Sequence, residues 1–175
     1  MALETTVIEG KLTDAFGSNV TGFVQMKDIL SFEVAPASVN DVMRYLKEDG
    51  VLRFNFLTDV CGVHYPDNDK ERQFAVVYHM HNWMDNVRIR FKAFLDGDNP
   101  EVDTVTNLFL GANWQERETY DFYGIIFKGH PQLKRILNMD EMVSFPMRKE
   151  FPLEDGGRTD KDDRFFGRIT DNATN

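Results

Sequence analysis

The sequence predicts an α+β fold, in which a compact domain with a mostly antiparallel sheet is flanked by helices and followed by an extended C-terminal tail. Apolar residues recur at helical spacing near the N-terminus and after Ser38, and capping and stop residues indicate a further helix around residues 113–124. Between these segments, several short stretches alternate apolar and polar residues, as the strands of a half-buried sheet do. Because the strands cluster between helices, their pairing is expected to be mostly antiparallel.

Two helices and two strands are expected in the first fifty residues. Each helix has apolar residues on one face, and the strands between them are short. In chain order, these elements are a helix over residues 3–16, strands over Val20–Met26 and Ile29–Val34, and a helix that begins after Ser38 and ends at Gly50. Ser38 and Asp41 have the spacing of a capping box, with Asp in place of the usual Glu.

Three strands are expected next, because apolar and polar residues alternate in three further stretches. These stretches run from Leu52 to Phe56, from Phe74 to Met80 and from Val87 to Ala93. Turn-forming residues, at 66–69 and 96–100, follow the first and the last of them.

A third long helix is expected from Asn113 to Gly124. Asn113 can cap it, Glu116 stands three residues later as in a capping box, and Gly124 is a natural C-terminal stop. A short helix with Pro131 at its first position is expected to follow. Its apolar side would consist of Leu133, Ile136 and Leu137.

The last part of the chain differs from the rest. After Asn138 no apolar period is visible, and Pro146 and Pro152 stand among mixed charges. Such a segment rarely packs on itself, so it is either disordered or ordered by a partner. We therefore divide the chain into a compact domain over residues 1–137 and an extended, partner-binding segment over residues 138–175.

The composition excludes several classes of protein. With 20 basic and 29 acidic residues among 175, the chain has a net charge of −9, which argues against a nucleic-acid binder. The single cysteine, Cys61, cannot form an internal disulfide or hold an iron–sulfur cluster alone. The sequence has neither the apolar run of a signal peptide nor that of a membrane span. We expect an intracellular protein that reaches a membrane only through a complex.

Two weak candidate sites stand outside the long helix. His79 and His81 are two residues apart on a predicted strand and would need a third ligand to bind a metal ion. Cys61 and His64 have the residue types of a nucleophile pair, but no strand–turn–helix elbow surrounds them. No glycine-rich motif for binding phosphate is present. The alternative without a function is that His79 and His81 lie on a half-exposed sheet face and that Cys61 is a small buried side chain.

The helix at 113–124 interleaves large aromatic side chains with charges. Trp114, Glu118 and Asp121 fall along one side, and Arg117 is one turn from Asp121. An unpaired buried carboxylate is costly, so the aromatic content favours a buried ionic network. The alternative is a solvated helix with weak surface ion pairs.

Four blocks of sequence, in the helix at 113–124 and in the residues after it, resemble one known family. They are Asn113–Glu118 (NWQERE), Asp121–Ile125 (DFYGI), Gly129–Leu137 (GHPQLKRIL) and Phe145–Leu153 (FPMRKEFPL). Weaker counterparts lie at Leu57–Asp59, Tyr65–Pro66 and Val77–Met80, so that the similarity covers roughly residues 50–155. The sequence resembles the C subunit of proton-pumping NADH:quinone oxidoreductase, respiratory complex I.

The resemblance implies a role without a redox centre. A family member is a peripheral-arm subunit that packs on the D subunit, near the place where the last iron–sulfur cluster passes electrons to quinone. NADH, FMN, the iron–sulfur clusters and quinone would be bound by other subunits. The complex would lie at the cytoplasmic side of the cell membrane, and we expect no catalytic, cofactor or metal residue in this chain.

The charge pattern and the resemblance together suggest three groups of structural residues. The network that fixes the long helix would comprise Glu116, Arg117, Glu118 and Asp121, with Asn113, Trp114 and Gly124 in the same motif. The next turn would be shaped by His130, Pro131 and Arg135. The interface anchors would be Pro146, Arg148, Lys149, Phe151 and Pro152, since Arg and aromatic residues dominate binding hot spots. We expect Arg117 to contribute to assembly of the complex. The alternative is that it stabilises the fold of this chain from within.

Two other functions stay open. Related subunits of membrane-bound hydrogenases and of photosynthetic quinone reductases have similar motifs. A free-standing enzyme that uses His79, His81, His64 or Cys61 belongs to another class, and metal analysis of the purified chain would reveal it.

Overall fold

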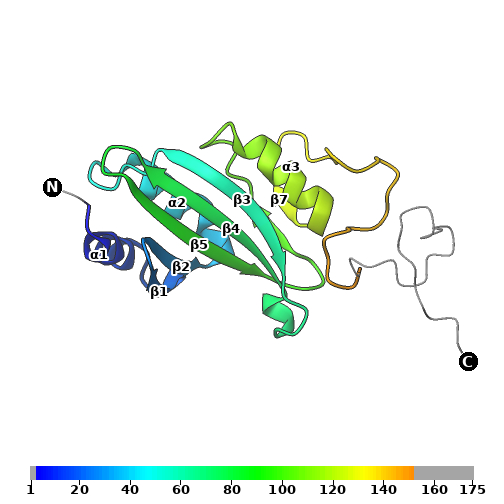
Figure 1. Ribbon diagram of the computed structural model, residues 1–175, viewed down its shortest axis with the longest axis horizontal. Helices are drawn as coiled ribbons and strands as arrows, with labels where there is room; N and C mark the ends of the chain where they lie inside the picture. The colour runs from blue at the N-terminus through cyan, green and yellow to red at the C-terminus, as the bar shows by residue number, and fades with distance from the viewer. Residues whose placement is uncertain (1–2, 152–175) are drawn as a thin grey trace, which may run out of the picture.

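A five-stranded sheet lies at the centre of the computed structural model, which describes residues 3–151 (Figure 1). Its order is β1-β2-β5-β4-β3, and only β2 and β5 pair in parallel. The strands are β1 (Val20–Met26), β2 (Ile29–Val34), β3 (Phe56–His64), β4 (Phe74–Asn82) and β5 (Val87–Leu95). The predicted mostly antiparallel sheet is therefore confirmed, and β1 and β2 have the predicted bounds.

Three α-helices accompany the sheet in the described part of the chain. They are α1 (Thr5–Phe16), α2 (Val39–Glu48) and α3 (Ala112–Tyr123). Two short strands that were not predicted, β6 (Glu101–Asp103) and β7 (Ile126–Lys128), pair in parallel on either side of α3 in the sequence. None of the helices within residues 3–151 is long and apolar enough to cross a lipid bilayer.

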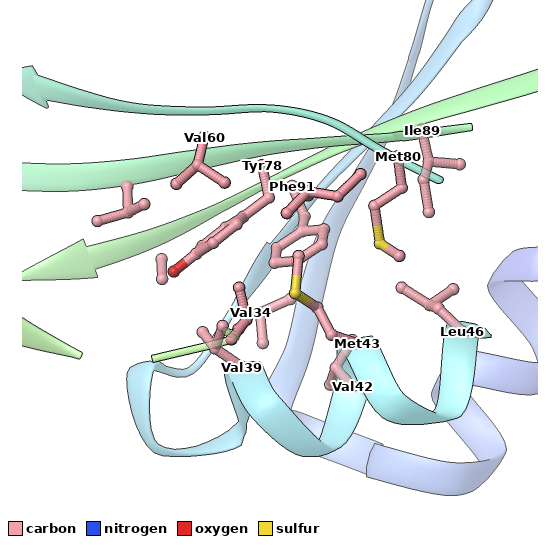
Figure 2. Close-up of a cluster of buried hydrophobic side chains, with 14 of the residues drawn as sticks. Val34, Val39, Val42, Met43, Leu46, Val60, Tyr78, Met80, Ile89 and Phe91 are labelled. Carbon is pink, nitrogen blue, oxygen red and sulfur yellow. The ribbon is translucent and has the colours of Figure 1, made fainter. Parts of the chain in front are cut away.

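The main core lies between α2 and the sheet. Figure 2 shows the apolar face of α2, which carries Met43 and Leu46, turned toward Tyr78, Met80 and Phe91 of β4 and β5. The rings of Tyr78 and Phe91 stack with centroids 4.9 Å apart. The period-two pattern of β5 therefore reports burial on one face, as strand alternation does, whereas β4 is buried at every position except His79.

All three helices lie on this same face. α1 lies beside α2, where the Phe16 and Tyr45 rings meet at 5.5 Å. α3 packs on β3, because a Cβ atom at Gly62 would lie 2.6 Å from the Tyr123 ring. Gly62 and Val60 pair with Val76 and Tyr78, whose side chains face the core. The opposite face of the sheet therefore has no α-helix over it within residues 3–151; Figure 1 shows the long strands in front of α2.

The predicted strand from Leu52 to Phe56 is wrong. Leu52 and Phe54 are buried, but they close the end of α2 in an irregular turn. The Phe54 N–H donates to the Leu46 carbonyl at 2.8 Å, and Arg53 has a φ of +46°. Burial of alternate residues in a turn imitates a strand pattern, and β3 itself starts only at Phe56.

Both predicted capping boxes are also wrong. Ser38 makes no capping hydrogen bond, because it ends a 3₁₀ turn, Pro36–Ser38, that leads directly into α2. α3 begins at Ala112, so Asn113 is inside the helix, and Gly111 precedes it without a side-chain cap. The end of α3 is as predicted, since Gly124 has a φ of +73°.

Candidate functional site

The buried side of α3 is polar. Glu116 and Asp121 are fully buried, and Arg117 is 8% exposed. Trp114 and Glu118, by contrast, are exposed, so the helix is less buried than its aromatic residues suggest. The Trp114 ring lies against the Arg117 guanidinium, 5.2 Å away.

Asp121 organises the segment that follows β7. One carboxylate oxygen, Oδ2, accepts the backbone N–H groups of Ile136, Leu137 and Asn138 at 3.1, 2.8 and 2.9 Å. The other, Oδ1, accepts from Arg135 Nη1 at 2.7 Å and from the Asn138 amide at 3.1 Å. Burial on its own raises the pKa of Asp121, but these donors outweigh it and hold the pKa well below its usual range.

The predicted short helix after Pro131 does not form, and Asp121 supplies the reason. A helix would need the N–H groups of residues 136–138 for its own carbonyl oxygens, whereas here they bind a carboxylate. Residues 131–138 therefore form a turn, irregular chain and a bend.

Arg135 ties three stretches of chain together. Its Nη1 also donates to the Asp121 carbonyl at 2.9 Å. Its Nη2 donates to the carbonyl oxygens of Met142 and Ser144 at 2.5 and 2.9 Å. The guanidinium lies 5.0 Å from the centre of the Phe145 ring. Arg135 thereby holds residues 142–145 against the end of α3.

Arg117 bonds to backbone rather than to a carboxylate. Its Nε and Nη2 donate to the carbonyl oxygens of Lys134 and Arg135 at 3.1 and 3.0 Å. No carboxylate within residues 3–151 lies within 4 Å of its guanidinium, and Glu118 has no ion pair in that range either. In the described residues, the four predicted members form no ion pair with one another. Asp121 pairs with Arg135 instead, Arg117 binds backbone carbonyl oxygens, and Glu118 is exposed.

Glu116 is buried, and no Lys or Arg in the described part of the chain forms an ion pair with it. Its carboxylate accepts the Thr104 hydroxyl at 2.5 Å and the Val105 N–H at 2.8 Å. Burial raises the pKa of Glu116 to about 7, although these two hydrogen bonds lower it in part. His130 Nε2 lies 4.0 Å from the carboxylate.

His130 is held in its neutral form. Its Nδ1 accepts the Gln132 N–H at 3.0 Å, so the proton is on Nε2, which donates to the Asn113 carbonyl at 3.2 Å. Burial lowers the pKa of His130. Beside this ring, Pro131 is exposed in the turn.

The chain then returns to the C-terminal end of α3. Arg148 Nε donates to the Tyr123 carbonyl at 2.7 Å, and its guanidinium lies between the rings of Phe74 and Phe145 at 4.9 and 4.8 Å. The Lys149 N–H donates to His64 Nδ1 at 3.0 Å. Pro146 is half-buried, Lys149 and Phe151 are exposed, and Pro152 lies outside the described residues.

The two weak candidate sites have ordinary structural surroundings. His81 Nε2 is 3.0 Å from the Asn86 amide oxygen, and His79 Nδ1 is 3.7 Å from Asp59. No cluster of three potential metal ligands exists within residues 3–151. Cys61 and His64 lie on opposite faces of β3, and burial raises the pKa of the Cys61 thiol to about 11.

Several residues of the network were missed from the sequence. Thr104, Val105 and Asn138 bind the two buried carboxylates, and Phe74 and Phe145 enclose Arg148. Asn138 directly follows the sequence block at 129–137, so its part in the network could have been predicted. The other contacts join residues far apart in the chain, and no local pattern marks them.

Comparison with known proteins assigns a family. Residues 32–156 match the family "Respiratory-chain NADH dehydrogenase, 30 Kd subunit". The chain is 40% identical to the C subunit of NADH-quinone oxidoreductase from Roseiflexus sp. (strain RS-1) over 168 residues, 95% of each chain. It is also 40% identical to the C subunit numbered 2 of the same enzyme from Rhizobium etli (strain CIAT 652) over 154 residues, 87% of this chain and 80% of the relative.

Two solved structures are similar in fold. A trypsin-resistant fragment of Nqo5 has a TM-score of 0.59 and 30% identity, and the match covers 72% of this chain and 98% of the fragment. A chain of the membrane-bound sulfane sulfur reductase, an archaeal respiratory membrane complex, has a TM-score of 0.70 and 26% identity over 85% of each chain. With the family match and the full-length relatives, these similarities confirm the resemblance seen in the α3 motif, and the chain belongs to the family of the 30 Kd subunit of respiratory-chain NADH dehydrogenase, that is, the C subunit of NADH-quinone oxidoreductase.

Proposed function

We propose that this chain is an assembly subunit without a redox centre in the peripheral arm of NADH:quinone oxidoreductase. In this role it packs on the D subunit near the quinone site and supports electron transfer from NADH to quinone, coupled to proton translocation. The supporting observation is the segment over residues 135–151, which hydrogen bonds of Asp121, Arg135 and Arg148 hold against α3.

This segment turns apolar side chains outward. The exposed members are Leu137, Met139, Val143, Met147 and Phe151, and Val143 is 94% exposed. Several large apolar side chains in one short stretch are typical of a protein–protein interface. Because internal hydrogen bonds already fix the backbone, little conformational entropy is lost when a partner covers these side chains.

The buried charges support a structural rather than a redox role. Arg117, Asp121 and Arg135 are all engaged by groups of this chain, so their charges stabilise the fold. The Cys61 thiol, with its raised pKa, is a poor thiolate ligand. We propose that NADH, FMN, the iron–sulfur clusters and quinone are bound by other subunits, and that the chain is held at the cytoplasmic side of the membrane through them.

A second candidate is a related membrane complex with another electron donor or acceptor. The fold similarity to a chain of the sulfane sulfur reductase complex favours it. In that case the same outward apolar segment would contact the corresponding neighbour of a different complex.

Affinity capture tests the proposal. The tagged full chain is isolated from mildly solubilised membranes, and the captured proteins and NADH oxidation are measured. We expect iron–sulfur and quinone-site subunits with NADH-dependent activity. Hydrogenase-type subunits would favour the second candidate, and a lone soluble chain would contradict both.

A pair of matched variants locates the interface. Val143→Glu places a charge on the outward segment, whereas Leu110→Glu changes a side chain that is similarly exposed, at 89%, before α3. We expect Val143→Glu to abolish capture of the D subunit and Leu110→Glu to leave it unchanged, with equal melting temperatures of the isolated chains. Equal capture by both variants would contradict the proposed interface.

A further inference from the structure

The face of the sheet opposite the helices carries a row of cations. Arg88, Arg90 and Lys92 alternate along β5 with Ile89 and Phe91, which point into the core. The three cationic side chains therefore project from the open face of the sheet, next to His79 and His81 on β4 in the strand register.

These cations have no carboxylate partners in the described part of the chain. Within residues 3–151, no carboxylate lies within 4 Å of Arg88, Arg90 or Lys92. Arg90 instead contacts Ser31 and Met26, and Lys92 contacts the Tyr65 hydroxyl.

Two acidic side chains, Glu33 and Asp59, are close to the cations in the strand register, but neither lies within 4 Å of Arg88, Arg90 or Lys92. Asp59 lies 3.7 Å from His79, and Glu33 pairs with Arg72 at 2.9 Å. The middle of the face is thus positive, although the whole chain has a net charge of −9.

Apolar side chains border the cations on both sides. On β1, Val24 and Met26 are more than half exposed. At the other side, the rings of Phe56 and Trp83 meet at 5.2 Å, and Trp83 is 62% exposed. A groove of about 560 Å³ lies at this end of the sheet, and its lining includes Phe56, Thr58, His79, His81, Trp83 and Arg88.

Antiparallel sheets often have one solvated face, and that face is usually polar rather than apolar. Here an aromatic-walled groove adjoins arginines that have no carboxylate partner within residues 3–151. Arg and aromatic side chains together are typical of binding hot spots. We propose that this open sheet face binds an acidic segment of a neighbouring subunit, with carboxylates on Arg88 and Arg90 and an apolar side chain in the groove.

The chemistry favours this occupant over two others. A second copy in a two-fold arrangement would bring the same row of cations against itself. A flat bilayer has no side chain that could fill the groove. The inference rests on the proposed function, because it requires that the chain is assembled with other subunits.

Photo-crosslinking in the assembled complex tests the occupant. Trp83 is replaced by p-benzoylphenylalanine in the tagged full chain, the complex is irradiated, and the attached residue is identified by mass spectrometry. We expect a crosslink to a segment of another subunit that is rich in Asp and Glu. A crosslink to lipid, to a second copy or to a segment without acidic residues would overturn the inference, as would no crosslink in an intact complex.

Charge reversal tests the cations, with a matched control. Arg88→Glu reverses an exposed arginine on the open face, and Arg44→Glu reverses an exposed arginine on α2, behind the sheet. We expect Arg88→Glu to lower the crosslink yield about tenfold and Arg44→Glu to leave it unchanged. Equal yields would overturn the inference, provided that the melting temperatures of the isolated chains agree.

The two proposals fail in different ways. If the unmodified chain captures no other subunit, the proposed function is wrong and the inference falls with it. If capture is normal but the crosslink contradicts the acidic segment, only the inference is wrong.

Discussion

Asp121 on α3 and Arg135, fourteen residues further along the chain, form a buried ion pair at 2.7 Å. The Asp121 carboxylate also accepts three consecutive backbone N–H groups, and the Arg135 guanidinium donates to three backbone carbonyl oxygens. This pair and its hydrogen bonds, here called the joint, hold residues 135–145 against the end of α3.

Asp121→Asn is expected to destabilise the isolated chain strongly. The substitution keeps the shape but removes the charge that balances Arg135, and breaking a buried pair in this way costs about 3 kcal/mol. Thermal and denaturant unfolding at pH 7 would measure the loss. The exposed Glu118→Gln variant loses the same charge from the same helix and should melt like the unmodified chain. Equal stability of the two variants would show that the joint carries little energy.

Arg117→Ala is expected to lower the melting temperature of the isolated chain. The substitution leaves the carbonyl oxygens of Lys134 and Arg135 without a donor, which costs about 2 kcal/mol. These two hydrogen bonds support the alternative from the sequence, in which Arg117 stabilises the fold of this chain rather than assembly with other subunits. A normal melting temperature combined with failed assembly would reverse that conclusion.

Glu116 is expected to make stability fall as the pH rises. Its pKa is raised from 4.5 to about 7 by burial, so the native state binds a proton more tightly than the unfolded state. The stabilisation is complete below pH 4.5, is lost progressively as the pH rises towards 7, and is absent above that, a change of about 3 kcal/mol.

Glu116→Gln isolates this effect. A glutamine can still accept the Val105 N–H and donate to the Thr104 hydroxyl, but it does not titrate. We expect the variant to be more stable than the unmodified chain at pH 8 and similar to it at pH 5. Parallel stability curves for both proteins between pH 5 and 8 would contradict a buried, titrating Glu116.

Gly124→Ala is expected to destabilise the chain by about 1–3 kcal/mol and to loosen residues 145–148. The residue has a φ of +73°, and an added Cβ would lie 2.6 Å from the Phe145 ring and 2.7 Å from the Arg148 guanidinium. Gly10→Ala is the control, because nothing lies within 4 Å of its Cβ position in α1. It should stabilise the chain slightly. Limited trypsin cleavage at Arg148 should increase in Gly124→Ala alone.

Sequence patterns predicted the structure correctly where a single helix, strand or turn produces the pattern. The alternation in β5 and the stop at Gly124 depend on strand pleat and on backbone conformation at single residues. The patterns failed where distant contacts decide. Leu52 and Phe54 alternate like strand residues, but the end of α2 holds them in a turn. Glu116 has the spacing of a capping residue, but Thr104 and Val105 bind its carboxylate instead.

By itself, the sequence determined the α+β class, most of the helices and strands, and the family, since these depend on periodicity and on contiguous motifs. Only the tertiary structure decided what the charged residues of the motif do. Whether Asp121 is ionised, whether Glu116 holds a proton and whether residues 131–138 become helical depend on burial and on donors from the segments that follow β6 and β7. Those free energies arise from distances between residues far apart in the chain, which no local pattern encodes.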